Sequence, residues 1–563
     1  MRIVVVGGVA GGMSCAARAR RLDESAEIVV LERGANVSFA NCGLPYFVGG
    51  EIEDEGSLLV QTPEMLRASL NLDVRTGHDV VGVDADAQTV TVRTLAGEER
   101  IGYDALVLAP GARAVRPEIP GLDSPRVRTL RSVEDAVHLR AHVEAGVQRA
   151  VVLGAGFIGV EAAEALALQG VETTLIQLAD QVLTPVDAEF SWLVAEELRR
   201  LGVDVRTGVA AEVILPGEDA DVIALSDGTK VSAELIVLSI GVRPDTAVFE
   251  AAGVACERGA MIVDAHGGTS VPRVWAVGDA VLSEDPATGV RRPVALAGPA
   301  NRAGRLVADA ILRPDRARPI PAPLGTAVVR IGRLTVALTG ASRASLSHAG
   351  IDFRTISLHP NQHAAYFPGA APVHLNVHFR EGDGRILGAQ ACGTDGVDKR
   401  IDVLATALRA GMSVDDLIDL DLAYSPPYGQ AKDPVNLAGM LGANVLDGTM
   451  RLWNAQDLDL VRETSLVLDV RGDAEVAEGM IPEALHIPHT QLRERLREVR
   501  LAAAGRPVRV LCASGVRSAI AHRILDQSGF DSASLSGGMT TLRMVLANRA
   551  DQVLTRPRPA RDV

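Results

Sequence analysis

The sequence has 563 residues, of which 47% are hydrophobic and 23% are charged, and its formal net charge is -15. The length predicts several globular domains, the acidic balance argues against a nucleic-acid-binding surface, and no apolar run approaches the roughly 20 residues of a membrane-spanning helix. The five cysteines are widely spaced, at positions 15, 42, 256, 392 and 512. This spacing predicts neither a disulfide framework nor a metal site, and it favours a reducing, cytoplasmic setting.

The chain begins with a predicted buried strand, residues 3–6, that runs directly into a glycine-rich turn at residues 7–12. A helix over residues 13–22 and a second strand over 28–31 follow. This order is typical of a dinucleotide-binding unit, in which a helix N-terminus faces a pyrophosphate and an acidic residue accepts a hydrogen bond from a ribose. The predicted contacts are Gly7, Gly8, Val9, Ala10, Gly12, Glu32 and Arg33. The alternative is that the glycines serve close packing only, since Val9 stands where a middle glycine is usual.

The same pattern returns between residues 150 and 177. A strand over 150–153 leads into a complete G-x-G-x-x-G turn and a helix over 160–169. A second such unit in one chain predicts a nicotinamide nucleotide beside the first nucleotide. Its predicted contacts are Gly154, Gly156, Gly159, Glu161 and Gln177. Because Gln177 stands where an acidic residue usually binds the ribose 2′-hydroxyl, the choice between NADH and NADPH stays open.

Two later landmarks belong with the first unit. A strand over residues 105–108 is followed by Gly111, and a strand that begins at residue 274 ends in Gly278-Asp279. The second landmark predicts that the chain returns to the first domain. Gly111, Gly278 and Asp279 are therefore further predicted cofactor contacts, with Asp279 facing the ribityl chain of a flavin.

Cys42 stands alone in the segment Ser38-Phe39-Ala40-Asn41-Cys42-Gly43-Leu44-Pro45-Tyr46. A flavin reductase that stores electrons in its own disulfide needs a second cysteine nearby, but Pro45 and Phe47 stand at the positions three and five residues on. A lone thiol beside a flavin must pair with sulfur or oxygen from outside, as a mixed disulfide, a persulfide or a sulfenic acid.

Residues 1–445 resemble the coenzyme A-disulfide reductase group of the pyridine nucleotide-disulfide oxidoreductases. The resemblance rests on the motifs at residues 7–14, 38–46, 298–302, 424–428 and 432–434. It implies a homodimer in which Cys42 lies on the si face of FAD and is redox-active as a mixed disulfide with coenzyme A. The coenzyme A contacts that it implies are Ser14, Arg18, Arg21, Ser38, Asn41, Asn301, Arg305 and Lys432.

Tyrosines form the remaining catalytic candidates of this region. Tyr366 and Tyr424 resemble residues that reach the active site from the partner subunit, and Tyr428 follows Tyr424 across two prolines. Arg18 and Arg21 lie one turn apart on the first predicted helix, so they are also placed to pair with substrate phosphates. The alternatives are a packed corner for the tyrosine loop and solvated side chains for Arg18, Arg21 and Lys432.

Residues from about 455 to 550 resemble a rhodanese (sulfurtransferase) domain. Cys512 and Arg517 bracket a loop between a strand and a helix. Such a loop can direct backbone N–H groups at one sulfur and hold a persulfide, while Arg517 supplies a fixed positive charge. The alternative is an inactive rhodanese fold that serves docking.

The predicted fold class is α/β, with two Rossmann-like domains, an α+β dimerisation domain and a rhodanese-like α/β domain. The predicted domains are FAD-binding (1–111 and 245–320), NAD(P)H-binding (112–244), dimerisation (322–445) and rhodanese (455–552). The predicted activity is NAD(P)H-dependent reduction of coenzyme A disulfide, coenzyme A persulfide or polysulfide, with Cys512 as sulfur carrier. The alternatives are an NADH oxidase and a redox-sensing flavoprotein. Ala10 replaces the histidine of oxygen- and peroxide-reducing relatives, which argues against peroxide as the main oxidant.

Overall fold

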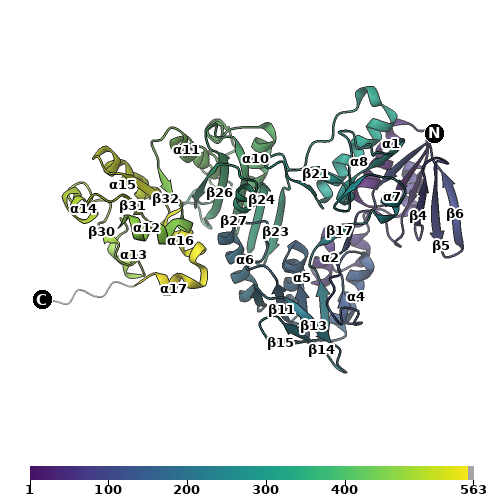
Figure 1. The fold of residues 1–563 in the computed structure, drawn as a ribbon, viewed down its shortest axis with the longest axis horizontal. Coiled ribbons are helices and arrows are strands. Elements are labelled where there is room, and N and C mark those ends of the chain that lie inside the picture. Colours follow the sequence, from purple (N-terminus) through teal and green to yellow (C-terminus); the bar gives the residue numbers. More distant parts are fainter. Residues whose placement is uncertain (556–563) are drawn as a thin grey trace. The chain divides into compact units, whose positions relative to one another are not determined.

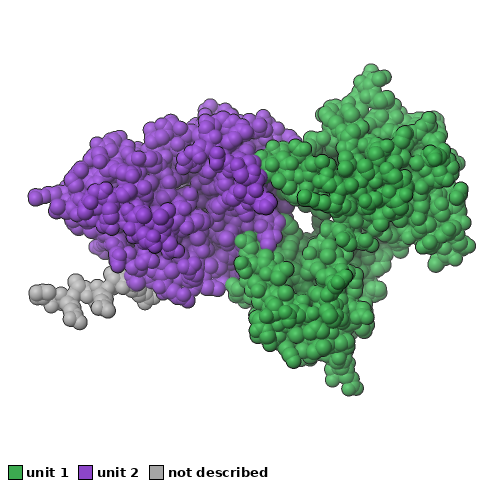
Figure 2. Space-filling view, in the orientation of Figure 1, with its two compact units in different colours: residues 1–183, 198–325 green, residues 184–197, 326–563 purple. Residues whose placement is uncertain are grey.

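The computed structural model describes residues 1–555 and confirms the predicted α/β class. The chain divides into two compact units, shown in different colours in Figure 2. Unit 1 contains residues 1–183 and 198–325, and unit 2 contains residues 184–197 and the chain from residue 326 onward. Figure 1 labels the elements in chain order. No helix of the described residues is long and apolar enough to cross a membrane.

Unit 1 begins with a five-stranded parallel sheet in the order β20-β7-β1-β2-β3. Its strands are β1 (Arg2–Val6), β2 (Glu27–Leu31), β3 (Asp73–Arg75), β7 (Ala105–Leu108) and β20 (Val274–Ala276). Because β20 pairs with β7, the chain does return to this sheet, as the Gly278-Asp279 landmark predicts. The strand order reverses beside β1, and ligands of open α/β sheets bind at the carboxyl end of the strands at such a point.

Both faces of this first sheet are covered, which explains why β1 is apolar at every position after Arg2. Ile3 and Val5 pack in one core cluster with α1 (Ala10–Leu22) and α8 (Ala297–Leu312). Val4 and Val6 pack in a second cluster with side chains of a three-stranded antiparallel sheet. Its strands are β4 (Asp79–Asp84), β5 (Thr89–Thr94) and β6 (Gly97–Gly102).

A second five-stranded parallel sheet in unit 1 has the order β12-β11-β10-β16-β9. Its elements are β9 (Val127–Arg128), β10 (Arg149–Leu153), β11 (Glu172–Gln177), β12 (Asp204–Thr207) and β16 (Leu235–Leu238), with helices α4 (Val133–Glu144) and α5 (Phe157–Leu168). A small antiparallel sheet follows, with β13 (Ala211–Leu215), β14 (Asp221–Leu225) and β15 (Lys230–Ala233). The repeat of strand, glycine turn and helix in the sequence therefore correctly predicts these two parallel sheets of unit 1.

The other helices and strands of unit 1 are short. They are α2 (Leu44–Val48), α3 (Pro63–Leu70), β8 (Ala112–Ala114), β17 (Val242–Pro244), α7 (Ala247–Ala251), β18 (Cys256–Glu257), β19 (Ala260–Met261), β21 (Leu282–Glu284) and β22 (Arg291–Pro293). Of these, α2 begins two residues after Cys42 and packs near α4 and α5. It therefore joins the Cys42 segment to the second nucleotide unit.

Unit 2 contains an antiparallel sheet in the order β23-β24-β27-β26-β25. Its elements are β23 (Ala327–Ile331), β24 (Leu334–Gly340), β25 (Phe353–Leu358), β26 (Val373–Arg380), β27 (Ile386–Gly393), α9 (Arg343–His348), α10 (Val397–Ala410) and α11 (Pro434–Leu446). The apolar run over residues 328–338 forms a hairpin, because Gly332 takes a left-handed conformation at its turn. Helix α6 (Ala188–Arg200) begins in this unit, where the Asp187 backbone N–H donates to Gln390 Oε1.

The last part of unit 2 is a small α/β domain with a five-stranded parallel sheet in the order β28-β32-β31-β29-β30. Its elements are β28 (Leu452–Trp453), α12 (Leu458–Thr464), β29 (Leu466–Asp469), α13 (Asp473–Ala477), β30 (Leu485–His486), α14 (Leu496–Ala503), β31 (Val508–Leu511), α15 (Val516–Gln527), β32 (Ser532–Leu535), α16 (Gly538–Leu546) and α17 (Ala550–Val553). Separate apolar clusters cover its two faces. The domain therefore has its own core.

Candidate active sites

The first glycine turn connects β1 to α1. Gly7 has a φ of +99°, and a Cβ atom on it would lie 2.0 Å from the carbonyl oxygen of Ala109. A Cβ atom on Gly12 would lie 2.0 Å from the carbonyl oxygen of Gly7, so neither position accepts a side chain. Glu32 closes the turn, because its two carboxylate oxygens accept hydrogen bonds of 2.8 Å from the N–H groups of Gly8 and Gly34.

The other residues predicted to bind the first nucleotide follow strands of the first parallel sheet, near the carboxyl ends of those strands. Val9 precedes α1 and Ala10 opens it, whereas Arg33 forms an ion pair with Asp245. Gly111 follows β7 with a φ of +70°. Asp279 follows β20, and burial raises the pKa of its carboxyl group.

These residues fit FAD. The turn brings backbone N–H groups to the start of a helix, where a pyrophosphate binds. No group among the described residues donates a hydrogen bond to the Asp279 carboxylate, which leaves that half-buried acceptor for the hydroxyls of a ligand.

The second glycine turn repeats this geometry between β10 and α5. Gly154 has a φ of +99°, and a Cβ atom on Gly159 would lie 1.9 Å from the carbonyl oxygen of Gly154. A Cβ atom on Gly156 would meet nothing within 4 Å, so the backbone is open there for a ligand. Gln177 Oε1 accepts a hydrogen bond of 2.8 Å from the Ala155 N–H. The N–H₂ group of Gln177 has no hydrogen-bond acceptor among the described residues and stays available as a donor, where a carboxylate would present an acceptor.

Cys42 lies in a short 3₁₀ turn, Asn41–Gly43, directly before α2, and its side chain is exposed. Two backbone hydrogen bonds fix the segment, from the Ser38 N–H to the Gly8 carbonyl and from the Ala40 N–H to the Leu58 carbonyl. The predicted contacts Ser38 and Asn41 therefore lie next to Cys42 and the first glycine turn. Partial burial, and then the charge of Glu161, raise the pKa of the Cys42 thiol.

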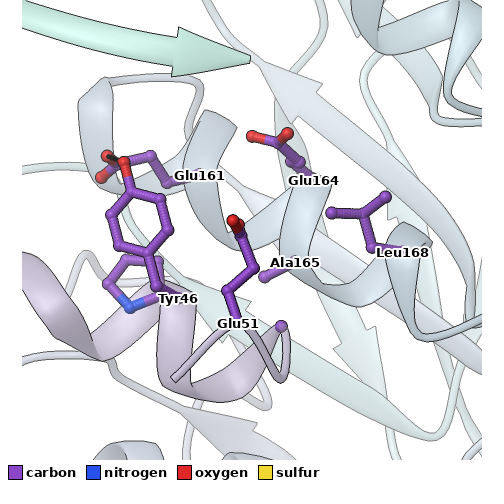
Figure 3. Close-up of a pocket in the computed structure, with 8 residues that line it drawn as sticks. Tyr46, Glu51, Glu161, Glu164, Ala165 and Leu168 are labelled. Carbon is purple, nitrogen blue, oxygen red and sulfur yellow. Dashed lines mark hydrogen bonds between the residues drawn. The ribbon is translucent and has the colours of Figure 1, made fainter. Parts of the chain in front are cut away.

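A pocket beside α2 and α5 contains Glu161. Figure 3 shows Tyr46 pointing its hydroxyl toward Glu161, and the Tyr46 Oη donates to Glu161 Oε1 at 3.4 Å. Glu51 and Glu164 also line the pocket. Glu164 is only 5% exposed, because α5 packs against α2. The second nucleotide unit therefore presents two carboxylates, those of Glu161 and Glu164, close to the Cys42 segment.

Five of the predicted coenzyme A contacts lie on the paired helices α1 and α8. Ser14 Oγ donates to Asn301 Oδ1 at 2.6 Å, and Arg18 donates from Nε and Nη2 to Asp309 Oδ1 at 2.9 and 2.6 Å. Arg21 and Arg305 are exposed. Sequence reasoning missed Asp309, although it continues the four-residue spacing of Asn301 and Arg305. The two helices together present a surface rich in arginine.

The tyrosine candidates and Lys432 lie in unit 2. Tyr366, Tyr424 and Tyr428 are 76%, 49% and 75% exposed, and the hydroxyls of Tyr366 and Tyr424 are 3.1 Å apart. Lys432 is exposed beside Asp433. The structure thus brings the three tyrosines and Lys432 onto two neighbouring loops.

Buried contacts tie these two loops together. The Ala364 N–H donates to the Gly429 carbonyl, and Arg400, which is 1% exposed, donates from Nη2 to the Gln362 carbonyl and to Asp433 Oδ2. Sequence reasoning missed Arg400, because nothing local distinguishes it from the other arginines. Its guanidinium fixes both tyrosine loops.

Cys512 lies between β31 and α15 and is only 1% exposed. Its Sγ accepts hydrogen bonds from the Gly515 N–H at 3.2 Å and from Ser518 Oγ at 3.3 Å. The start of helix α16 packs against the loop, and the Met539 N–H there donates a hydrogen bond to the Cys512 carbonyl. A Cβ atom on Gly538 would lie 2.6 Å from that carbonyl, which explains the glycine at this position. The loop thus directs one backbone N–H group and one side-chain hydroxyl at the sulfur.

Arg517 is not a free charge. Its two terminal nitrogens donate to the two carboxylate oxygens of Glu475, each at 2.6 Å. This pairing lowers the pKa of the Glu475 carboxyl group to about 2 and raises the pKa of the Arg517 guanidinium group. The nearby Cys512 also contributes to the raised pKa of Arg517. Sequence reasoning placed a fixed positive charge at Arg517 and missed both its partner Glu475 and the donor Ser518.

The remaining cysteines have different surroundings. Cys15 and Cys392 are fully buried, and burial raises the pKa of both thiols, to about 12 for Cys15. Cys256 is half-buried. Among the described residues, no group of three or more His, Cys, Asp or Glu side chains is arranged to hold a metal ion.

Two Rossmann-like units, a lone exposed cysteine beside them and a rhodanese-type loop define a flavin- and nicotinamide-dependent oxidoreductase. Family models match residues 1–304 as a pyridine nucleotide-disulphide oxidoreductase, residues 326–434 as its dimerisation domain and residues 451–543 as a rhodanese-like domain. The chain belongs to the pyridine nucleotide-disulfide oxidoreductase family. This membership confirms FAD and a nicotinamide nucleotide as the cofactors.

Similar proteins span most or all of the chain. The coenzyme A disulfide reductase of Staphylococcus haemolyticus is 33% identical over 442 residues, which cover 78% of this chain and 98% of that protein. The crystal structure of reduced Bacillus anthracis CoADR-RHD has a TM-score of 0.94 and 38% identity and covers 97% of this chain and 98% of that one. A NAD-dependent persulfide reductase from A. fulgidus has a TM-score of 0.89 and 36% identity, with 96% and 100% covered.

Proposed function

We propose that this protein is an FAD-dependent NAD(P)H:coenzyme A-disulfide and coenzyme A-persulfide reductase that works through Cys42, with Cys512 as a sulfur carrier. The observation that carries the proposal is the formed sulfur site at Cys512, where Gly515 and Ser518 direct hydrogen bonds at Sγ, together with the exposed thiol of Cys42. The names of the similar reductases support both substrates. A sulfur carrier fused to the reductase favours persulfide.

The proposed chemistry begins at Cys42. Its thiolate attacks coenzyme A disulfide, so that one coenzyme A thiolate leaves and a Cys42–coenzyme A mixed disulfide forms. With coenzyme A persulfide, the thiolate attacks the inner sulfur and hydrosulfide leaves, and the same mixed disulfide forms. FAD, which the first glycine turn, Glu32 and Asp279 would hold, would supply to this disulfide the two electrons that come from NAD(P)H. Cys42 then returns to the thiolate, and the released coenzyme A takes up a proton.

The surrounding residues have proposed roles in binding and positioning. Arg21 and Arg305 are exposed on α1 and α8, where guanidinium groups suit the phosphates of coenzyme A, and Arg18 lies one turn from Arg21 in an ion pair with Asp309. Ser14, Ser38, Asn41, Asn301 and Lys432 complete the proposed contacts. In a homodimer, which the dimerisation domain supports, Tyr366, Tyr424 and Tyr428 act at the partner subunit's active site.

The cofactor preference and the cellular setting are also part of the proposal. The available N–H₂ group of Gln177 can donate to a ribose 2′-hydroxyl or to a 2′-phosphate, so we propose that the enzyme accepts both NADH and NADPH. We further propose that it works in the cytoplasm, where its five free thiols stay reduced. The predicted domain boundaries and site residues belong to the same proposal.

The test is anaerobic NADH oxidation with coenzyme A disulfide or coenzyme A persulfide as the oxidant. The native protein is compared with Cys42→Ser and with the matched control Cys256→Ser, which changes a half-buried thiol of the same unit. Turnover that is lost in Cys42→Ser and kept in Cys256→Ser supports the proposal. Turnover that survives in Cys42→Ser contradicts it, and fast oxygen consumption without a sulfur substrate would favour the oxidase alternative.

A further inference from the structure

The opening of the Cys512 loop has an unexpected charge balance. A guanidinium group that is free to form charge-assisted hydrogen bonds strengthens the binding of small inorganic anions. Here both terminal nitrogens of Arg517 are engaged by Glu475. The loop therefore presents an ion pair at the sulfur, where the sequence alone predicts a fixed positive charge.

Glu475 is held in place independently of Arg517. It lies on the short helix α13, and its Oε2 also accepts a hydrogen bond from the Gly472 N–H. Buried Arg471 donates to the Glu475 carbonyl and to the Gly479 carbonyl at the end of this helix, while it pairs with buried Asp469. The carboxylate of Glu475 is thus fixed by its own backbone anchors, and a ligand must displace it to reach Arg517.

Two further carboxylates lie nearby in the sequence, Asp473 on α13 and Glu478 just after it, but both are exposed, so solvent and salt screen their charges. At Sγ, the Gly515 N–H and the Ser518 hydroxyl donate hydrogen bonds, and Arg517, which is paired with Glu475, also interacts with Cys512. A dianion such as thiosulfate therefore meets an arginine whose charge Glu475 offsets, whereas a persulfide brings at most one negative charge to the reacting sulfur.

We propose that Glu475 is a specificity-determining residue that makes Cys512 select persulfide donors over inorganic dianionic donors. This inference rests on the proposed role of Cys512 as sulfur carrier. In the favoured reaction the Cys512 thiolate attacks the outer sulfur of R–S–SH, a new S–S bond forms, the donor S–S bond breaks, and R–S⁻ leaves and takes the proton. With thiosulfate the same attack releases sulfite, and three negative charges meet in one site.

The substitution Glu475→Gln tests the charge separately from the geometry, because the amide oxygen of the introduced side chain can still accept a hydrogen bond from Arg517. Glu478→Gln is the matched control, since it removes one charge from the same segment without touching Arg517. Both are made in full-length holoenzyme that carries Cys42→Ser, so that the reductase site does not consume the donor. Glutathione persulfide and thiosulfate are the probes, and the rate at which Cys512 gains one sulfur is followed by rapid quenching and mass spectrometry.

We expect Glu475→Gln to raise kcat/KM for thiosulfate roughly tenfold, mainly through KM, because one opposing charge at ion-pair distance is removed. Loading from glutathione persulfide should change less than about twofold, and Glu478→Gln should change neither donor by more than that. Equal losses with both donors, or no change with either, would overturn the inference while leaving Cys512 a sulfur carrier. If native Cys512 gains sulfur from neither donor, the proposed carrier function itself fails.

Discussion

The hydrogen bond from Ser518 to Cys512 allows a quantitative prediction. Ser518 is completely buried, and its hydroxyl accepts a hydrogen bond from Ser534 at 2.9 Å while it faces Sγ at 3.3 Å. Because Cys512 is 1% exposed, water cannot replace a donor that is removed. A hydrogen bond to a charged group contributes about 1.5–3 kcal/mol. Ser518→Ala should therefore lower kcat/KM for sulfur loading roughly tenfold to hundredfold.

The assay is the single-turnover loading of Cys512 from glutathione persulfide, with anaerobic coenzyme A-disulfide turnover measured on the same protein. Ser514→Ala is the matched control, since Ser514 lies in the same loop and makes no side-chain hydrogen bond among the described residues. It should stay within about twofold of the native protein. Ser518→Ala should leave turnover at Cys42 unchanged. Loading within twofold of native in Ser518→Ala would show that the loop does not stabilise the Cys512 thiolate in this way.

Three further perturbations follow from the structure. Arg400→Ala should lower the free energy of unfolding by about 3–5 kcal/mol in chemical denaturation, because it removes the buried guanidinium partner of the Asp433 carboxylate, whereas Lys399→Ala, which removes a half-exposed ammonium 3.9 Å from the same carboxylate, should cost less than about 1 kcal/mol; equal effects would refute this. Gln177→Asp should reduce kcat/KM for NADPH at least about tenfold relative to NADH, since a carboxylate repels the 2′-phosphate; an unchanged ratio would contradict it. Glu161→Gln should lower the pKa of Cys42, so that alkylation by iodoacetamide accelerates at a lower pH than in the native protein; a shift to higher pH would contradict it.

The parts of the sites that rest on local geometry could be predicted from the sequence. The glycine turns are one example, because the close approach of Gly12 to Gly7 depends on residues five positions apart. The loop from Cys512 to Arg517 is another, because its donors come from its own backbone and the first turn of α15. In each case the spacing along the chain already determines which atoms meet.

The parts that rest on distant partners could not be predicted. Asp309 pairs with Arg18 from 291 residues away, and Glu475 pairs with Arg517 from 42 residues away. Such pairings depend on how helices pack, which a single sequence does not specify. Glu164 illustrates the same point, since a charged residue on a helix reads as exposed until the packing of that helix is known. The charge balance at Cys512 therefore became visible only in the structure.

The central claim is that Cys42 carries coenzyme A as a mixed disulfide during turnover. The most direct measurement is mass spectrometry of the oxidised holoenzyme, after incubation with coenzyme A disulfide and again after anaerobic addition of NADH. We predict one coenzyme A adduct on the peptide that contains Cys42, and its complete release by NADH. An adduct on another cysteine, no adduct at all, or an adduct that NADH does not release would contradict the proposed mechanism.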